Sequence, residues 1–258
     1  MTDITENPHV KEERNGTPAG VPDSEASCRA PMTEELLLSA MPELDAEQMW
    51  KFTEYYNKLL DWNSRINLTR ITEPSEVAAK HFADSVLGAK LLPQGARVVD
   101  VGTGAGFPGV PLKIVRPDIE LVLVDSLGKR VKFLEELTRS LGIEAVCIHA
   151  RAEDAARQPG LREAFDAATS RAVAPMNVLL ELTTPFVKVG GASLMYKGAS
   201  AREELEVCGK ALRTLGCRAE CVDLEAEWGA RTIVLARKVS PTPAKFPRKA
   251  GTAQKTPL

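Results

Sequence analysis

The chain has 258 residues, a formal net charge of -2, and 44% hydrophobic and 26% charged residues, which fits a soluble globular protein. A chain of this length can bury a core without a disulfide or a metal ion. No apolar run approaches the roughly 18 residues that a transmembrane helix needs, so a membrane span is excluded. The opening residues carry acids and a proline without an apolar core, so we expect no secretory signal and a cytoplasmic protein.

Residues 1–31 differ in composition from the rest of the chain. They contain six acids against three bases, and four prolines interrupt them. Apolar residues show no periodicity there. This stretch therefore predicts a disordered acidic leader.

Residues 32–92 predict a helical region. Asp45 is followed three residues later by Gln48, which is the pattern of a capping box, and apolar residues then recur at helical spacing. A second helix begins around Pro74, because proline is tolerated in the first turn, and ends near residue 92. His81 and Asp84 share one face of this helix. We interpret them as a core histidine and a helix cap, in preference to an active-site lid.

Short apolar strands alternate with helices over residues 93–239. The predicted strands span 97–101, 120–124, 145–149, 166–170, 192–196, 219–224 and 232–236. The predicted helices span 111–116, 128–141, 152–157, 175–188 and 201–215. Several strands are apolar throughout, which indicates burial on both faces of a parallel sheet, and only a turn at 227–230 joins the last two strands. The pattern predicts an α/β fold: a doubly wound, seven-stranded, mostly parallel sheet with an antiparallel last strand.

The residues after Glu227 carry charge of one sign. Seven lysines and arginines occur there, and no acid. Residues 240–258 also hold four prolines, so they predict a basic extended tail. Such a tail is either a solubilising surface or a site for phosphate groups.

The strongest chemical feature is the glycine-rich turn after the strand at 97–101. Gly102, Gly104 and Gly106 permit positive φ angles and a close approach of the backbone to a ligand, and the next helix offers free N–H groups. A dinucleotide loop has the spacing G-x-G-x-x-G, which Gly104, Gly106 and Gly109 match, but two residues past the strand end. The tighter spacing from Gly102, preceded by Asp100, is typical of methyltransferases that bind S-adenosylmethionine.

The next strand ends on Asp125, where an acid can hold the ribose hydroxyls of either ligand. This residue does not discriminate between the two, whereas the antiparallel last strand favours the methyltransferase sheet. A nicotinamide-dependent dehydrogenase and a glycine turn without a ligand are the alternatives.

The five cysteines and three histidines give no metal-binding pattern. The sequence contains neither C-x-x-C nor H-E-x-x-H, and the histidines are scattered. Reduced thiols and no metal site are therefore expected.

Two long strings of residues carry a resemblance to a known family. They are Asp100-Val-Gly-Thr-Gly-Ala-Gly-Phe-Pro-Gly-Val-Pro-Leu-Lys-Ile-Val-Arg-Pro117 and Leu123-Val-Asp-Ser-Leu-Gly-Lys-Arg-Val-Lys-Phe-Leu134. Shorter matches are Asn67-Leu-Thr69, His81-Phe-Ala-Asp-Ser85, Arg151-Ala-Glu153, Ser170-Arg-Ala172, Tyr196-Lys-Gly198 and Pro247-Arg-Lys-Ala-Gly-Thr252. From about residue 50 onward the chain resembles the bacterial small-subunit ribosomal RNA guanine-N7 methyltransferases, also called glucose-inhibited division protein B.

The resemblance implies methyl transfer from S-adenosylmethionine to N7 of one guanine in 16S ribosomal RNA. It implies cofactor contacts at Gly102, Gly104, Phe107, Asp125, Ser126, Leu127, Ala152, Glu153 and Arg171. A salt bridge is the alternative role for Arg171. The implied partner is 16S ribosomal RNA or the small ribosomal subunit, and we expect a monomer. Methylation of N7 removes no proton, so alignment is the main task and the sequence names no catalytic residue.

Six cations are candidates for contact with RNA phosphates: Lys129, Arg130, Lys197, Lys245, Arg248 and Lys249. A solvated strand-end lysine is an equally weighted interpretation of Lys197. Two other functions stay open at this point. One is a methyltransferase of the same cofactor that acts on a protein or a small molecule, and the other is a non-catalytic RNA-binding assembly protein with a vestigial pocket.

Overall fold

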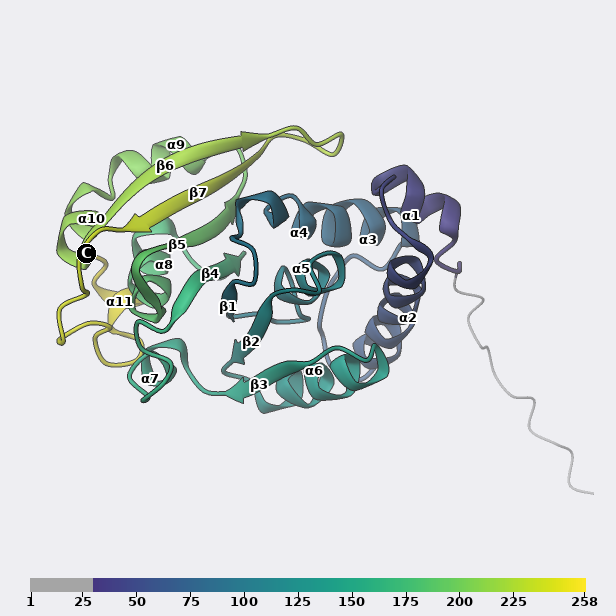
Figure 1. Ribbon diagram of the computed structural model, residues 1–258, viewed down its shortest axis with the longest axis horizontal. Coiled ribbons are helices and arrows are strands. Elements are labelled where there is room, and N and C mark those ends of the chain that lie inside the picture. The colour runs from purple at the N-terminus through teal and green to yellow at the C-terminus, as the bar shows by residue number, and fades with distance from the viewer. Residues whose placement is uncertain (1–29) are drawn as a thin grey trace, which may run out of the picture. The chain divides into compact units, whose positions relative to one another are not determined.

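A seven-stranded sheet forms the centre of the structure (Figure 1). The computed structural model describes residues 30–258 of the chain. The strands are β1 (Arg97–Val101), β2 (Glu120–Asp125), β3 (Ala145–His149), β4 (Phe165–Arg171), β5 (Val187–Lys197), β6 (Cys217–Leu224) and β7 (Arg231–Lys238). Their order in the sheet is β3-β2-β1-β4-β5-β7-β6. Strands β1 to β5 pair in parallel, and β7 pairs antiparallel with both β5 and β6. The predicted sheet is confirmed.

The apolar runs in the strands are explained by burial on both faces. Successive side chains of a strand point to opposite faces. In β1, Val98 joins one hydrophobic core, whereas Val99 and Val101 join another on the opposite face. A strand covered on both sides needs apolar residues at every position, which is the pattern of a parallel sheet.

Helices cover both faces of the sheet. They are α5 (Gly109–Val115), α6 (Gly128–Ser140), α7 (Ala152–Ala155), α8 (Met176–Thr183), α9 (Ala201–Glu206) and α10 (Gly209–Leu215). Helices α5 and α6 share the core that contains Val98. Residues of α8 and α10 pack with Met195 of β5 and Val234 of β7 in a separate core on the other face.

The helical region packs against the same core as α5 and α6. It contains α1 (Glu34–Ala40), α2 (Ala46–Asn63), α3 (Pro74–Val77), a π-helical segment (Ala78–Ala83), α4 (Asp84–Val86) and a 3-10 turn (Ala89–Leu91). The predicted capping box is present, because Asp45 accepts from the Gln48 N–H and the Gln48 side chain accepts in return. Phe52 and Tyr55 of α2 are fully buried in this core. Residues 31–258 form one compact unit, so the helical region is a layer of that unit.

Two predicted helices have different boundaries in the structure. The helix expected at 175–188 ends at Thr183, because Pro185 cannot continue it, and β5 begins at Val187. The helix expected at 201–215 is divided into α9 and α10, with Gly209 at the start of the second part. Glycine is a weak helix former, which explains a break at this point.

The carboxy-terminal segment 240–258 is folded against the rest of the unit, and the predicted extended conformation is wrong. Arg162 donates to the carbonyls of Phe246 and Thr242 at 2.8 and 2.9 Å. Arg248 forms an ion pair with Glu181, and a short helix, α11 (Thr252–Lys255), follows. Partners more than 60 residues away therefore hold a segment whose composition suggested a free tail.

Two expectations concern other features of the chain. The predicted leader is almost entirely outside the described residues, which begin at residue 30. In the part of the chain that the structure describes, no helix is both long and apolar enough to span a membrane.

Candidate functional site

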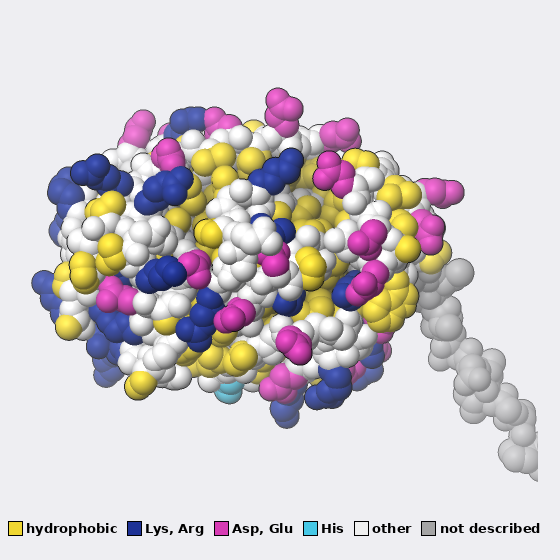
Figure 2. Space-filling model, viewed as in Figure 1, with side chains coloured by type: hydrophobic (Ala, Val, Ile, Leu, Met, Phe, Trp, Pro, Cys, Tyr) yellow, Lys and Arg dark blue, Asp and Glu magenta, His cyan; other side chains and the backbone are white. Residues whose placement is uncertain are grey.

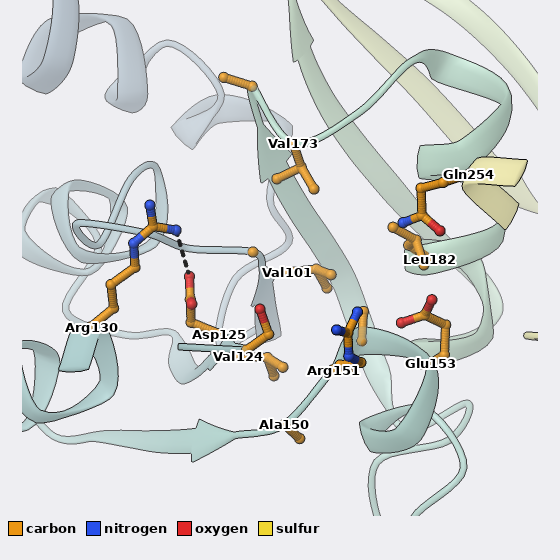
Figure 3. A pocket seen from close by; sticks show the side chains of 14 residues that line it. Val101, Val124, Asp125, Arg130, Ala150, Arg151, Glu153, Val173, Leu182 and Gln254 are labelled. Carbon is orange, nitrogen blue, oxygen red and sulfur yellow. Dashed lines mark ion pairs between the residues drawn. The ribbon is translucent and has the colours of Figure 1, made fainter. Parts of the chain in front are cut away.

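A cavity of about 270 Å³ lies at the carboxyl ends of β1, β2 and β4. Ligands of open α/β sheets bind at this edge, where strand order reverses between β1 and β4. Its lining comprises Val101, Gly102, Val124, Asp125, Ser126, Arg130, Ala150, Arg151, Ala152, Glu153, Ala172, Val173, Leu182 and Gln254. In Figure 3, Asp125 and Arg130 lie on one side, and Glu153, Leu182 and Gln254 lie on the other. We call these sides the loop wall (Gly102–Gly109 with Asp125) and the tail wall (Glu153, Leu182 and residues 246–255).

The loop wall is shaped by glycine backbone. Gly102 and Gly104 have φ angles of +70° and +59°, values that residues with a Cβ rarely adopt. A Cβ on Gly102 would lie 2.7 Å from Cγ2 of Val173, which faces it from the turn after β4. The absence of a side chain on Gly102 thus leaves the space between the loop and Val173 open.

The carboxylate of Asp125 is held in place by backbone N–H groups. Its Oδ2 accepts from the Gly104 N–H at 2.9 Å, and its Oδ1 accepts from the Leu127 N–H at 2.8 Å. The side chain is only 3% exposed, and a nitrogen of the Arg130 guanidinium lies 3.6 Å from Oδ2 (Figure 3). These contacts fix the Asp125 carboxylate at the cavity edge.

The helical region supports the loop wall from behind. The Tyr55 hydroxyl donates to the carbonyl of Ala105 at 2.5 Å. A Cβ on Gly106 would lie 2.6 Å from that hydroxyl oxygen, so the tyrosine and the loop pack tightly. Phe107 stacks between Tyr55 and His81, with ring centroids 5.3 and 4.6 Å away. Helix α2 and the π-helical segment therefore set the position of the loop.

Asp100 links the loop to the sheet. Its Oδ2 accepts from the Gly109 N–H at 3.0 Å, and its Oδ1 accepts from the Thr169 hydroxyl at 2.8 Å. The side chain is fully buried, and this burial raises its pKa to about 6 against the opposing effect of those hydrogen bonds. Because Asp100 does not line the cavity, its chemical role is to hold the loop.

The tail wall is built from distant parts of the chain. Glu153 at the start of α7 is 5% exposed and accepts from the Gly251 N–H at 2.9 Å. Arg248 donates from Nε and Nη2, one edge of its guanidinium, to Glu181 of α8, whose carboxylate is 1% exposed. The next turn of chain brings Gln254 into the cavity lining.

Five of the sequence-predicted cofactor residues line the cavity: Gly102, Asp125, Ser126, Ala152 and Glu153. The other four are absent from its lining. Gly104 and Leu127 do not line the cavity, but their N–H groups donate hydrogen bonds to Asp125, which does. Phe107 lies in the core behind the loop.

Arg171, the fourth, is engaged in a salt bridge. Its guanidinium donates to Asp84 of α4 at 2.9 Å and lies over the Phe107 ring, 4.8 Å from the centroid. The same buried Asp84 accepts from Arg231 and Trp228 near the start of β7. Arg171 therefore joins the helical region to the sheet in this structure, which corresponds to the alternative role that its position allowed.

The candidate RNA-binding cations fall into three groups. Arg130 lines the cavity, and the side chains of Lys197 and Arg248 are bound to Glu204 and Glu181. The ion pair of Arg248 differs from the expected phosphate contact, because its guanidinium is committed to a buried carboxylate. Three side chains are exposed instead: Lys129, Lys245 and Lys249.

Several lining residues were not predicted. Arg151 is adjacent to the predicted residue Ala152, and Val173 lies two positions after the predicted residue Arg171, so the sequence indicated both neighbourhoods. Leu182 and Gln254 had none, because they reach the cavity only through the packing of α8 and the carboxy-terminal segment. Among residues 30–258, no three His, Cys, Asp and Glu side chains are grouped so as to hold a metal ion.

Comparison with known proteins decides the family. A family model described as rRNA small subunit methyltransferase G (GidB) matches residues 48–231. The chain belongs to this family. Two similar relatives carry the name ribosomal RNA small subunit methyltransferase G. The one from Desulfitobacterium hafniense is 50% identical over 84% of this chain and 92% of its own length. The one from Lactobacillus delbrueckii subsp. bulgaricus is 48% identical over 84% and 94%.

Solved structures agree on the fold. A protein from Klebsiella pneumoniae has a TM-score of 0.52 at 16% identity and covers 80% of this chain and 96% of its own. One from Corynebacterium glutamicum has a TM-score of 0.50 at 14% identity with the same coverage. At such identities the likeness concerns the fold alone.

The residues of the cavity fit S-adenosylmethionine, the methyl donor of this methyltransferase family. Gly102 leaves free the space that a side chain would fill, and Asp125 offers a carboxylate at the end of β2 for ribose hydroxyls. The volume is near the lower end of small-molecule pockets, which is about 300 Å³. Gly102 and Asp125 would hold the cofactor on the loop wall.

Proposed function

We propose that this chain transfers a methyl group from S-adenosylmethionine to N7 of a specific guanine in 16S ribosomal RNA. The observation that carries the proposal is the family match over residues 48–231 combined with an intact cavity at the carboxyl edge of the sheet. The relatives' names support RNA of the small ribosomal subunit as substrate.

The chain's contribution to the reaction is alignment. When bound, S-adenosylmethionine supplies a methyl group activated by a sulfonium. Guanine N7 offers a lone pair without a proton to remove, so the protein needs no general base. Asp100, the acid with a raised pKa near the loop, is fully buried and already accepts from Gly109 and Thr169, which is consistent with a supporting role. Proximity and orientation alone can supply a large part of such a rate enhancement.

The distribution of charge supports RNA approach from the tail-wall side. Lys and Arg side chains gather at the end of the molecule that holds α10 and the C-terminus, whereas Asp and Glu gather over α1 and α2 (Figure 2). Exposed Lys245 and Lys249 belong to the segment that forms the tail wall, and exposed Lys129 is next to Arg130 of the cavity. Such cations would contact phosphates and position the RNA without reading its sequence.

The deciding experiment maps 7-methylguanosine in 16S ribosomal RNA. Cells without the gene should lack one 7-methylguanosine, and the intact gene should restore it. A Gly102→Val gene should not restore it although the protein accumulates. An unchanged modification pattern in the deletion strain contradicts the substrate. Restoration by the Gly102→Val protein would instead favour a non-catalytic assembly role.

A further inference from the structure

The carboxy-terminal segment forms part of the cofactor cavity, although it lies outside the residues that the family model matches. That match ends at residue 231, whereas Gln254 lines the cavity beside Leu182. Figure 3 shows Gln254 and Glu153 on the same side, across the cavity from Asp125. Neither the motif nor the family match assigns Gln254 a role.

The segment is fixed in this position by buried contacts. The carboxylate of Glu181 is 1% exposed and binds both the N–H and the guanidinium of Arg248, at 2.8 and 2.6 Å. Three residues on, the Gly251 N–H donates to Glu153. Ala253 is buried against Val178 and Leu182 of α8. The contacts of Arg248, Gly251 and Ala253 therefore fix the position of the α11 backbone that carries Gln254.

The chemistry of the tail wall suits the adenine end of the cofactor. An adenine ring has apolar faces and an edge that combines an N–H donor with ring-nitrogen acceptors. Leu182 and Ala152 offer apolar surface, and the Gln254 amide offers a donor and an acceptor together, as in amide recognition of adenine in DNA. The Glu153 carboxylate would repel the carboxylate of the methionine end. With ribose at Asp125, the adenine therefore faces the tail wall.

We propose that Gln254 binds the polar edge of the adenine ring of S-adenosylmethionine. The proposal rests on the cofactor of the proposed function, but it is independent of the RNA substrate. It makes the carboxy-terminal segment a determinant of cofactor recognition.

The test is calorimetric binding of two product analogues to the full chain. S-adenosylhomocysteine carries adenine, whereas S-inosylhomocysteine carries hypoxanthine, in which an oxygen replaces the amino group and the ring N1 becomes a donor. Gln254→Ala should weaken S-adenosylhomocysteine binding about five- to tenfold, the loss expected for one or two hydrogen bonds. It should also reduce the preference of the wild type for adenine over hypoxanthine. Gln254 is exposed, so the variant should fold normally.

Lys255→Ala is the matched control, because Lys255 is the exposed neighbour of Gln254 in α11 and does not line the cavity. It should bind both analogues like the wild type. Equal affinity of wild type and Gln254→Ala for S-adenosylhomocysteine, or an unchanged preference for adenine, overturns the role of Gln254 alone. Failure of the wild type to bind S-adenosylhomocysteine overturns the cofactor and this proposal together.

Discussion

The two walls of the cavity are built in different ways. The loop wall comes from the ends of two neighbouring strands, β1 and β2, and its Gly102 and Asp125 are set by positive φ angles and backbone N–H groups. The tail wall is assembled by charged contacts between residues far apart, 67 positions for Arg248 and Glu181 and 98 for Gly251 and Glu153. A short sequence motif therefore determines one side of this cavity, whereas the other side forms only when distant parts of the chain pack together.

The roles of the charged residues after Glu227 also depend on distant contacts that the sequence does not show. Seven cations without an acid suggested a phosphate-binding tail. Four of them form ion pairs with acids elsewhere in the chain: Arg231 with Asp84, Arg237 with Glu220, Lys238 with Glu163 and Arg248 with Glu181. Three of these paired cations belong to β7, and Arg248 is the one that holds the segment 240–258 in place. The lysines of the segment, Lys245, Lys249 and Lys255, are exposed and stay candidates for contact with RNA.

The largest expected effect concerns the loop wall. Gly102→Val should weaken S-adenosylmethionine binding by about 100-fold or more, because the new side chain meets Val173 and takes the ligand's space. Titration calorimetry of the purified variant measures the loss.

Gly142→Val is the control for backbone strain. Gly142 also has a positive φ, +62°, but a Cβ there meets nothing within 4 Å. Both variants should lose about 1–2 kcal/mol of folding stability from the left-handed backbone, and only Gly102→Val should lose the cofactor. Equal cofactor affinity of the two variants would contradict the steric role of Gly102.

The next effect concerns the tail wall. Arg248→Met leaves the Glu181 carboxylate buried without its partner, so the free energy of unfolding should fall by about 3 kcal/mol. Release of the segment should also weaken cofactor binding, through Gln254. Urea denaturation and calorimetry on the same protein measure both changes.

Lys249→Met separates structural charge from RNA-binding charge. Lys249 is adjacent to Arg248 but exposed, so its loss should leave stability and cofactor affinity unchanged. It should instead weaken RNA binding and reduce the slope of log affinity against log salt. If Arg248→Met and Lys249→Met have the same profile, the distinction between the two cations is wrong.

The walls also differ in how well sequence predicts them. The sheet, the loop and Asp125 follow from apolar runs and glycine spacing, which act over a few residues. Gln254 has no local signal, because its place depends on the docking of α11 against α8. The support of the loop by Tyr55 is similar, since periodicity places Tyr55 on a helix without naming its partner Ala105, 50 residues away.

The smallest expected effect is a pH dependence of stability that comes from Asp100 and His81, two residues that support the loop wall. Burial raises the pKa of Asp100 from 3.8 to about 6, so its contribution to stability is present below pH 4 and lost as pH rises through 6. Burial, and then the nearby Arg171, lower the pKa of His81 from 6.5 to about 4, so its contribution is present above pH 6.5 and lost as pH falls through 4.

These two contributions change stability in opposite directions between pH 4 and 6.5, so they partly cancel in the stability of the wild type. Relative to wild type, His81→Gln should gain stability as pH falls across this window, because only Asp100 still titrates there. Asp100→Asn should lose stability over the same window, because only His81 remains. Urea midpoints at several pH values measure the differences, and Gln254→Ala, which removes no titratable group, should run parallel to wild type. Parallel curves for all three variants would mean that the loop wall is held without any contribution from titration of these two residues.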